Sequence, residues 1–280
     1  MVHLTIQPWD LSASLITGRD LVYGIGPISE DTMVSVDPKR VELKLSIGAG
    51  DAKKAKKWLG LKDGEATRAT IWFCDQPRSD GDGDHFELFD RGVIVRLRRK
   101  HGDESNTTIK YRREPPLVLP PGWDPEVTPD FKVEGDWTIR SRKVAASLDS
   151  TVADAAIGQA GRNGPPLPSG LFSHDQRQFA ADLVAPHAVD LAALRPLGPI
   201  DARRWEEAPR RDLDNKVGAE RWRFDGMEFL ELSIRVRFEN AEEWLSRFAE
   251  WATDGGLNIA SVDKTKTQAV LEHFARPLAP

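Results

Sequence analysis

Basic side chains recur at every second position in several segments that alternate between polar and apolar residues. The clearest pairs are Arg96 and Arg98, Lys110 and Arg112, and Arg221 and Arg223. Side chains two residues apart on a β-strand point to the same face of the sheet. Like charges placed in this way repel each other, and a bound anion relieves the repulsion. The pattern therefore predicts a strand surface that binds a multiply charged anion.

Acidic side chains share the polar faces of two further segments. Glu42 precedes Lys44 by two positions in VELKLSI, and Glu231 begins a polar row in FLELSIRVRF that continues with Ser233 and Arg235. Carboxylate oxygens are preferred ligands of Mg²⁺ and Mn²⁺, which commonly bridge carboxylates to phosphates. A metal-assisted phosphate site is therefore one interpretation of these acids.

The elements that must position these side chains are mostly strands. Strands are expected at 41–47, 68–75, 92–100, 107–113, 131–137, 220–224 and 229–238, and helices at 51–61 and 241–253. Residues 138–195 are predicted to be a mostly helical insertion, interrupted by the loop GRNGPPLPSG. Because strands flank this insertion, residues 39–280 are predicted to form one domain. Residues 1–38 are interpreted as an N-terminal extension.

An antiparallel sheet with one solvated face would explain any one of these strands. Five strands with charge on one face and apolar residues on the other favour closure of the sheet. The charges would then line a lumen, and the apolar faces would pack against helices. We therefore expect an α+β fold built on a β-barrel with a polar, basic lumen.

The composition is that of a globular protein able to bury a core. Of the 280 residues, 30% are charged and 40% are hydrophobic, and the formal net charge of −5 argues against nucleic-acid binding. No apolar run is long enough to span a bilayer, and the first twenty residues lack the pattern of a secretory signal. Cys74 is the only cysteine, so we expect a cytoplasmic protein without disulfides or membrane contact.

Six blocks of the sequence, in order, resemble the CYTH superfamily of triphosphate tunnel proteins. They are RVELK (40–44), IWFCDQP (71–77), LFDRGVIVRLRR (88–99), TTIKYR (107–112), DGMEFLELSIRV (225–236) and KTKT (264–267). The superfamily includes class IV adenylate cyclases, thiamine triphosphatases and inorganic triphosphatases. The resemblance covers about residues 39–275 and implies an eight-stranded antiparallel tunnel that binds a triphosphate with one or two Mg²⁺ or Mn²⁺ ions.

The resemblance implies a role for individual residues. Those expected to hold phosphate are Lys44, Arg96, Arg98, Lys110 and Arg112, with Lys264 or Lys266. By their charge and alternation, Arg221, Arg223 and Arg235 are further candidates for phosphate binding. Glu42 and Glu231 would be metal ligands, and together with Lys44 they would be the catalytic residues.

Two positions depart from the pattern of the superfamily. Arg40 stands at the position of the first glutamate of the opening strand, and Ser233 at that of a second acid in the late strand. Arginine cannot bind a metal, and a hydroxyl is a poor substitute for a carboxylate. Glu134 and Asp136 could replace the missing ligands, as could Glu220; all three could also be solvent-facing charges.

These residues and the resemblance lead to three hypotheses about the function. The first is a metal-dependent phosphohydrolase acting on a triphosphate or polyphosphate compound. The loss of acid at Arg40 and Ser233 favours a second, a module that binds polyphosphate or a nucleotide without cleaving it. An adenylate cyclase is the third, although no residue selects a ribose hydroxyl as the nucleophile. The sequence determines neither the phosphate compound nor the oligomeric state.

Overall fold

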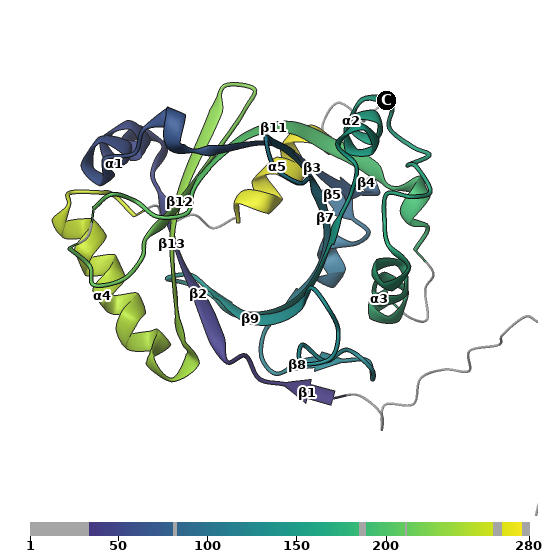
Figure 1. Cartoon of the computed structure of the whole chain (residues 1–280), viewed down its shortest axis with the longest axis horizontal. Helices are drawn as coiled ribbons and strands as arrows, with labels where there is room; N and C mark the ends of the chain where they lie inside the picture. Colours follow the sequence, from purple (N-terminus) through teal and green to yellow (C-terminus); the bar gives the residue numbers. More distant parts are fainter. Residues whose placement is uncertain (1–33, 81–82, 185–188, 211, 260–264, 276–280) are drawn as a thin grey trace, which may run out of the picture.

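Nine strands close into a β-barrel in the computed structural model of this chain (Figure 1). The structure describes residues 34–80, 83–184, 189–210, 212–259 and 265–275. Around the barrel the strands are β10 (Arg142–Thr151), β7 (Asn106–Arg113), β6 (Val93–His101), β3 (Thr67–Asp75), β11 (Arg195–Trp205), β12 (Gly218–Phe224), β13 (Met227–Arg237), β2 (Arg40–Ile47) and β9 (Phe131–Trp137). The pairing of β9 with β10 completes the ring.

The barrel itself is confirmed, but the prediction of eight antiparallel strands is wrong. Strands β2 and β9 are parallel, with Val41 opposite Gly135 and Leu43 opposite Trp137. The reason is the odd number of strands in the barrel. Strand directions cannot alternate around a closed ring of nine, so one neighbouring pair must run the same way.

The predicted helical insertion at 138–195 is also partly wrong. Helices α2 (Asp154–Asn163) and α3 (His174–Val184) do lie there, but residues 142–151 form β10. The alanines in RKVAASLDST suggest a helix, yet this segment pairs with both β7 and β9. Hydrogen bonding to a strand on each side thus outweighs the weak local preference of this segment for a helix.

Strand β11 was missed because its sequence, RPLGPIDARRW, contains the residues that usually interrupt strands. Its register with β3 shifts between Leu197 and Ile200. Gly198 lies in this bulge with a φ of 151°, and a Cβ there would stand 2.9 Å from the carbonyl oxygen of Ile71. Glycine is therefore required where β11 bends against β3.

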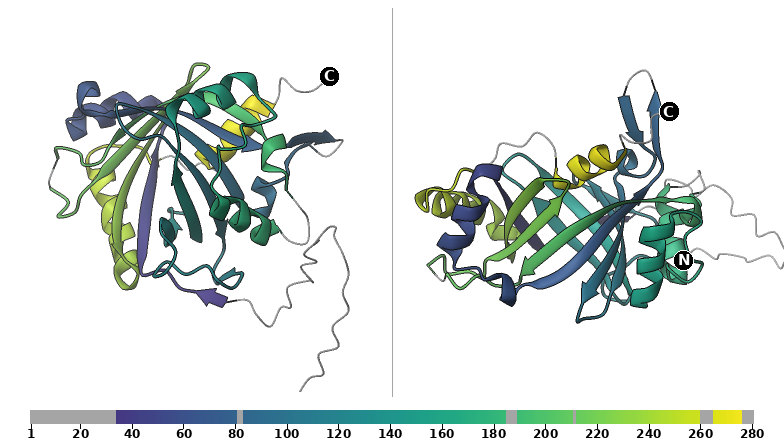
Figure 2. Two further views of the ribbon diagram at one scale, coloured as in Figure 1. Left: turned by 45° about the vertical axis from the view of Figure 1, so that its right-hand side comes forward. Right: turned by 90° about the horizontal axis from the view of Figure 1, so that it is seen from above.

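The remaining elements are short or lie outside the barrel. They are β1 (Val34–Val36), β4 (Pro77–Asp80), β5 (Gly83–Phe86), β8 (Leu117–Leu119), α1 (Ala52–Leu59), α4 (Ala241–Asp254) and α5 (Lys266–Ala275), with 3₁₀ turns at Ala49–Asp51, Asp63–Glu65, Phe89–Arg91, Leu191–Ala193 and Phe238–Asn240. The β4–β5 hairpin stands away from the barrel (Figure 2). Strand β1 belongs to the predicted extension and pairs with β8; residues 1–33 of that extension lie outside the described residues.

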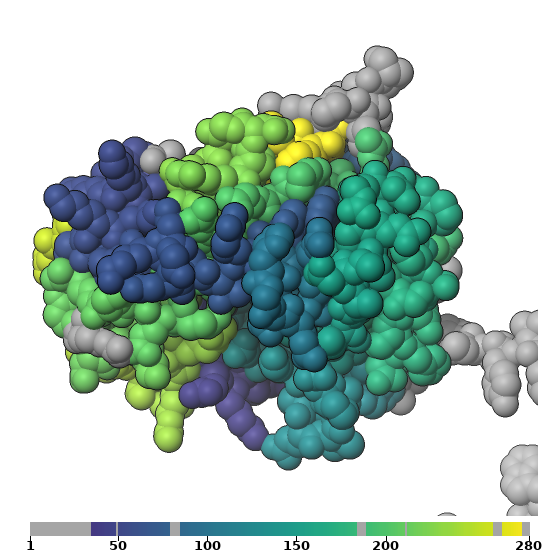
Figure 3. All heavy atoms as spheres, turned by 45° about the horizontal axis from the view of Figure 1, so that its top comes forward, coloured from purple at the N-terminus to yellow at the C-terminus, as the bar shows by residue number. Residues whose placement is uncertain are grey.

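Two apolar layers cover the outer face of the barrel. In one, α2 and α3 pack on β6, β7 and β10 through residues such as Leu97, Ile109 and Phe179. In the other, α1 and α4 pack on β2 and β13 through residues such as Leu45 and Phe248. Figure 3 shows the α1 segment (dark blue) and the α2–α3 segment (teal to green) on opposite sides. The outer faces of these five strands are therefore packed against helices, as predicted.

Helix α5 covers one end of the barrel (Figures 1 and 2). Its Val270 and Leu271 pack in a third apolar cluster with Phe73, Ala202 and Trp222 of the strands. The apolar contact holds the N-terminal turn of α5 against the lumen. No helix in the described ranges is long and apolar enough to cross a membrane.

The parallel closure of the barrel yields a prediction about Gly135. A Cβ at this residue would lie 2.8 and 2.9 Å from the methyl groups of the fully buried Val41. Gly135→Ala should therefore lower the free energy of unfolding by about 1–3 kcal/mol, measured by urea denaturation. Gly170→Ala is the matched control, because a Cβ there meets nothing within 4 Å. Equal stability of the two variants would contradict this account of the closure.

Candidate functional site

The barrel surrounds a cavity of about 1020 Å³ whose wall is strongly basic. Among the described residues that line it, 12 are lysine or arginine and 8 are aspartate or glutamate. The lumen thus carries four positive charges in excess, although the whole chain has a formal net charge of −5. Positive charge is therefore concentrated inside the barrel.

Most of the site residues predicted from the sequence meet in this cavity. Those that line it are Glu42, Lys44, Arg96, Arg98, Lys110, Arg112, Glu134, Asp136, Glu220, Ser233, Glu231, Arg235 and Lys266. They come from β2, β6, β7, β9, β12, β13 and α5. Lys264 lies outside the described residues, and Arg40 is exposed at the start of β2. The placement agrees with the prediction, while the roles of these residues stay predictions.

The prediction that Arg221 and Arg223 line the lumen is wrong. Arg221 is buried on the outer face, 3.6 Å from Asp63 and 3.7 Å from Glu228, and Arg223 is 2.8 Å from Glu228. Trp222 points into the cavity instead. Alternation alone shows that two residues share a face of a strand, but not which face is inside.

Sequence reasoning missed eight charged residues of the cavity wall, among them Lys132, Arg204 and Asp149. Lys132 lies on β9 in phase with Glu134, so the alternation of FKVEGDW could have identified it. Arg204 and Asp149 lie on β11 and β10, the two strands that were not predicted. They gave no signal because their segments were not interpreted as strands.

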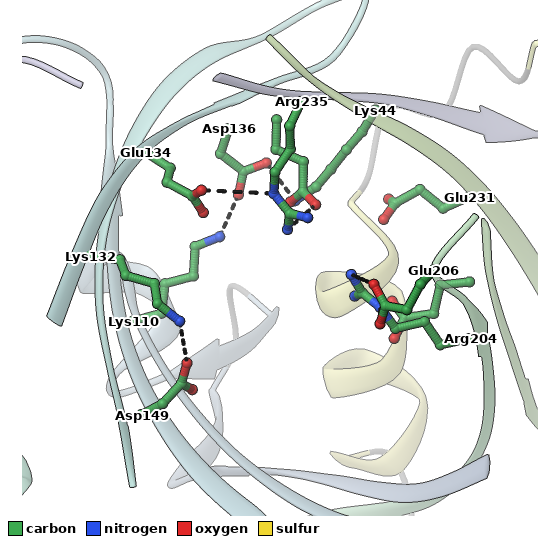
Figure 4. Close-up of polar contacts among 12 residues, drawn as sticks. Lys44, Lys110, Lys132, Glu134, Asp136, Asp149, Arg204, Glu206, Glu231 and Arg235 are labelled. Carbon is green, nitrogen blue, oxygen red and sulfur yellow. Dashed lines mark hydrogen bonds and ion pairs between the residues drawn. The ribbon is translucent and has the colours of Figure 1, made fainter. Parts of the chain in front are cut away.

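One cluster of ion pairs joins β2, β7, β9 and β13 across the lumen (Figure 4). The Lys44 Nζ lies 2.8 Å from Asp136 Oδ1 and 3.1 Å from Glu42 Oε2. Lys110 Nζ is 2.7 Å from the other oxygen of Asp136, and Arg235 Nη2 is 2.8 Å from Glu42 Oε1. Each charged group of this cluster thus has an opposite charge beside it.

The pKa values in this cluster follow from its pairing. Burial alone would raise the pKa of Glu42, but Lys44 and Arg235 lower it to about 2. Burial opposes ionisation of Asp136 too, yet Lys110, Lys44 and Arg112 hold its pKa well below the usual value. Burial would lower the pKa of Lys44, but Asp136 and Glu42 raise it.

A second cluster lies where α5 meets the barrel. Glu220 of β12 and Glu231 of β13 are directly opposite each other across the two strands. Lys266 Nζ lies 2.8 Å from Glu220 Oε2 and 2.9 Å from Glu231 Oε1. Burial disfavours the charge of Glu220, but Lys266, Arg98 and Arg204 hold its pKa far below the usual value. The ammonium of Lys266 therefore neutralises two carboxylates at once.

Between these clusters, β6 and β7 carry cations whose charge is incompletely compensated. The Nε atoms of Arg96 and Arg98 are buried and have no hydrogen-bond partner within the part of the chain that the structure describes. Burial and the neighbouring Arg98 lower the pKa of Arg96 to about 9. Burial also lowers the pKa of Lys110, despite its contact with Asp136. An anion placed here would satisfy these donors and relieve the repulsion.

The barrel resembles solved structures whose sequences are very different. A Bacillus halodurans protein provisionally described as an adenylate cyclase has a TM-score of 0.50 and 14% identity, covering 83% of this chain and 97% of its own. A Hippeastrum protein of the same provisional description, with a dominant triphosphatase activity, has a TM-score of 0.54 and 12% identity, covering 84% and 96%. The chain has the triphosphate tunnel fold. No family model and no curated protein matches the sequence.

The acids of this tunnel do not fit a resident divalent metal. The described residues contain no group of three or more histidine, cysteine, aspartate or glutamate side chains that could hold one. Glu231 pairs with Ser46, four positions along β2 from Glu42. At ~3.3 Å per residue, these two predicted ligands are separated by about 13 Å along the strand. Metal ligands lie about 2 Å from Mg²⁺, so Glu42 and Glu231 are poorly placed to share one ion.

The remaining predicted ligands are also bound to cations. Asp136 contacts Lys44, Lys110 and Arg112, and Glu134 lies 3.7 Å from Arg235. The acid that the superfamily pattern places between the two clusters is replaced here by Ser233, which is opposite Lys44. The departure at Ser233 thus leaves no carboxylate at this point between Glu231 and Glu42.

The low pKa of Glu42 yields a prediction about acid stability. Its pKa is about 2 in the folded protein, against an ordinary value of 4.5, so its stabilising effect is complete above pH 4.5. That effect is lost as the pH falls from 4.5 to 2. Glu42→Gln should therefore flatten the fall in the free energy of unfolding over this range, measured by urea denaturation.

The matched control for this prediction is Glu243→Gln, which changes an exposed glutamate on α4. It should keep the acid dependence of the unchanged protein. If Glu42→Gln also kept it, the Glu42–Lys44–Arg235 pairing would not be the source of that dependence.

Proposed function

We propose that the lumen binds the triphosphate group of a small molecule, or an inorganic polyphosphate. The observation that carries this proposal is the excess of four positive charges inside the cavity of an otherwise acidic protein. A triphosphate carries about four negative charges and many acceptor oxygens, which suit arginine forks and lysine ammoniums. The cavity volume of about 1020 Å³ also suits a nucleotide-sized compound.

The wall formed by β6 and β7 is the main phosphate-binding surface in this proposal. Arg96 and Arg98 are on β6, and Lys110 and Arg112 are on the neighbouring strand β7. Arg96 Nη2 already donates to Thr108 Oγ1 at 2.9 Å, which fixes the guanidinium against the wall. A guanidinium held in this way can bind phosphate without a large loss of side-chain entropy.

Arg96 offers a test of this binding. Arg96→Met should lower the affinity for inorganic tripolyphosphate by about tenfold or more, measured by isothermal titration calorimetry, because it removes charge-assisted hydrogen bonds. The same change should not lower the free energy of unfolding, since it removes an incompletely paired charge from the lumen.

The outer-face Arg223 provides the matched control. It lies on a barrel strand and pairs with Glu228 outside the cavity. Arg223→Met should leave the affinity unchanged. Equal losses in the two variants, or no binding to the unchanged protein, would refute a phosphate site in the lumen.

Hydrolysis of the bound triphosphate is a second candidate function. The Hippeastrum structure with a dominant triphosphatase activity supports it through the shared fold. In this role Glu42, Lys44 and Glu231 are the proposed catalytic residues. Because the acids do not fit a resident ion, we propose that any Mg²⁺ or Mn²⁺ enters already bound to the phosphates of the substrate.

Phosphate release tests this second candidate separately. Tripolyphosphate, ATP and thiamine triphosphate should each be assayed with Mg²⁺ and with Mn²⁺. We expect release from at least one compound, and its loss in Arg96→Met. No release from any compound by a protein that binds tripolyphosphate would leave a binding module, without catalysis, as the function.

A further inference from the structure

Two lysine ammoniums in the lumen are each held between two carboxylates from different strands. Lys44 lies between Glu42 of β2 and Asp136 of β9, and its Nζ contacts both at 3.1 and 2.8 Å. Lys266 lies between Glu220 and Glu231, at 2.8 and 2.9 Å. In each case one positive charge bridges two acids that would otherwise repel each other. The protein thus places a side-chain cation where a bound cation would be expected to sit.

The arrangement around Lys266 is the more informative of the two, because this lysine belongs to α5 and not to a strand of the barrel wall. Glu220 and Glu231 are a directly opposed pair of like charges, which destabilises a sheet unless a cation lies between them. Lys266 supplies that cation, and its Nζ also lies 4.0 Å from the centre of the Trp222 ring. The ammonium is therefore fixed by two ion pairs and one cation–π contact.

Both lysines keep their charge in these positions. Burial would lower the pKa of Lys266, but Glu220 and Glu231 raise it. Lys44 behaves in the same way between Asp136 and Glu42. Each ammonium is permanently present at neutral pH, whereas a divalent ion would depend on the metal supply.

We infer that Lys44 and Lys266 are built-in replacements for divalent metal ions, so that the lumen binds tripolyphosphate without any metal. This inference rests on the proposed triphosphate binding and specifies the cations that perform it. Ser233 is consistent with it, because it lines the cavity opposite Lys44 with a hydroxyl, which is a poor metal ligand. With the carboxylates neutralised internally, the four excess charges of the wall are left for the phosphates.

The first experiment measures the affinity of the full-length protein for inorganic tripolyphosphate by calorimetry, with EDTA and then with Mg²⁺. The affinity in EDTA should equal or exceed that in Mg²⁺, within about threefold. An affinity about tenfold or more higher with Mg²⁺ or Mn²⁺ would overturn the inference while leaving triphosphate binding intact. No binding under either condition would instead refute the proposed function.

Direct titration of Mn²⁺ into the protein without phosphate, followed by electron paramagnetic resonance, is independent of that function. Bound Mn²⁺ loses the sharp signal of the free ion. We expect the signal to remain that of free Mn²⁺. A stoichiometric Mn²⁺ site in the phosphate-free protein would overturn the inference even if tripolyphosphate also bound.

A variant at Lys266 tests the replacement itself. Lys266→Gln should weaken tripolyphosphate binding in EDTA, and Mn²⁺ should restore at least part of the affinity by entering between the vacated glutamates. Lys143→Gln is the control, since Lys143 also lines the cavity but only approaches Glu114, at 3.9 Å. Its loss of affinity should not be restored by Mn²⁺. Equal responses of the two folded variants to Mn²⁺, checked by circular dichroism, would contradict the assigned role of Lys266.

Discussion

Charges that point into a closed barrel are costly unless they are paired, because burial removes part of their hydration. This constraint organises the whole lumen. Four of its acids form two clusters, Glu42 and Asp136 around the ammonium of Lys44, and Glu220 and Glu231 around that of Lys266. The arginines and lysines of β6 and β7 lie between the clusters with part of their charge uncompensated. The triphosphate of the proposed function would complete the neutralisation.

The strands that the sequence predicted well are those with an unambiguous inner and outer face. In β6 the apolar Val95 and Leu97 alternate with the arginines, since the outer face packs on helices and the inner face does not. Strand β12 was predicted, but its faces were assigned wrongly because both of them mix large apolar and charged residues; Trp222 is inside and Arg221 outside. Strand β10 was not predicted, because its small residues are stabilised by pairing with a strand on each side. The local sequence carries no signal of that pairing.

The site was predictable in its residues but not in its pairings. Resemblance and alternation placed Glu231 and Lys266 at the lumen, yet the bridge between them depends on how α5 packs over the barrel end. That packing rests on apolar contacts such as Val270 and Leu271, far from the charges themselves. The departures at Arg40 and Ser233 could be interpreted only from the register of β2 with β13. That register shows Ser233 opposite Lys44.

The pairing of β2 with β13 has a consequence for how the chain folds as it leaves the ribosome. Glu42 and its partner Arg235 are 193 residues apart, so β2 must wait until β13 has been synthesised before these two strands can pair. Long-range pairing of this kind slows folding and leaves strand edges exposed in the meantime. Until β13 has been synthesised, the edge of β2 that it covers in the finished barrel lacks its partner. Mutations or chaperones that act before β2 and β13 pair would change the yield of folded protein without altering the finished lumen.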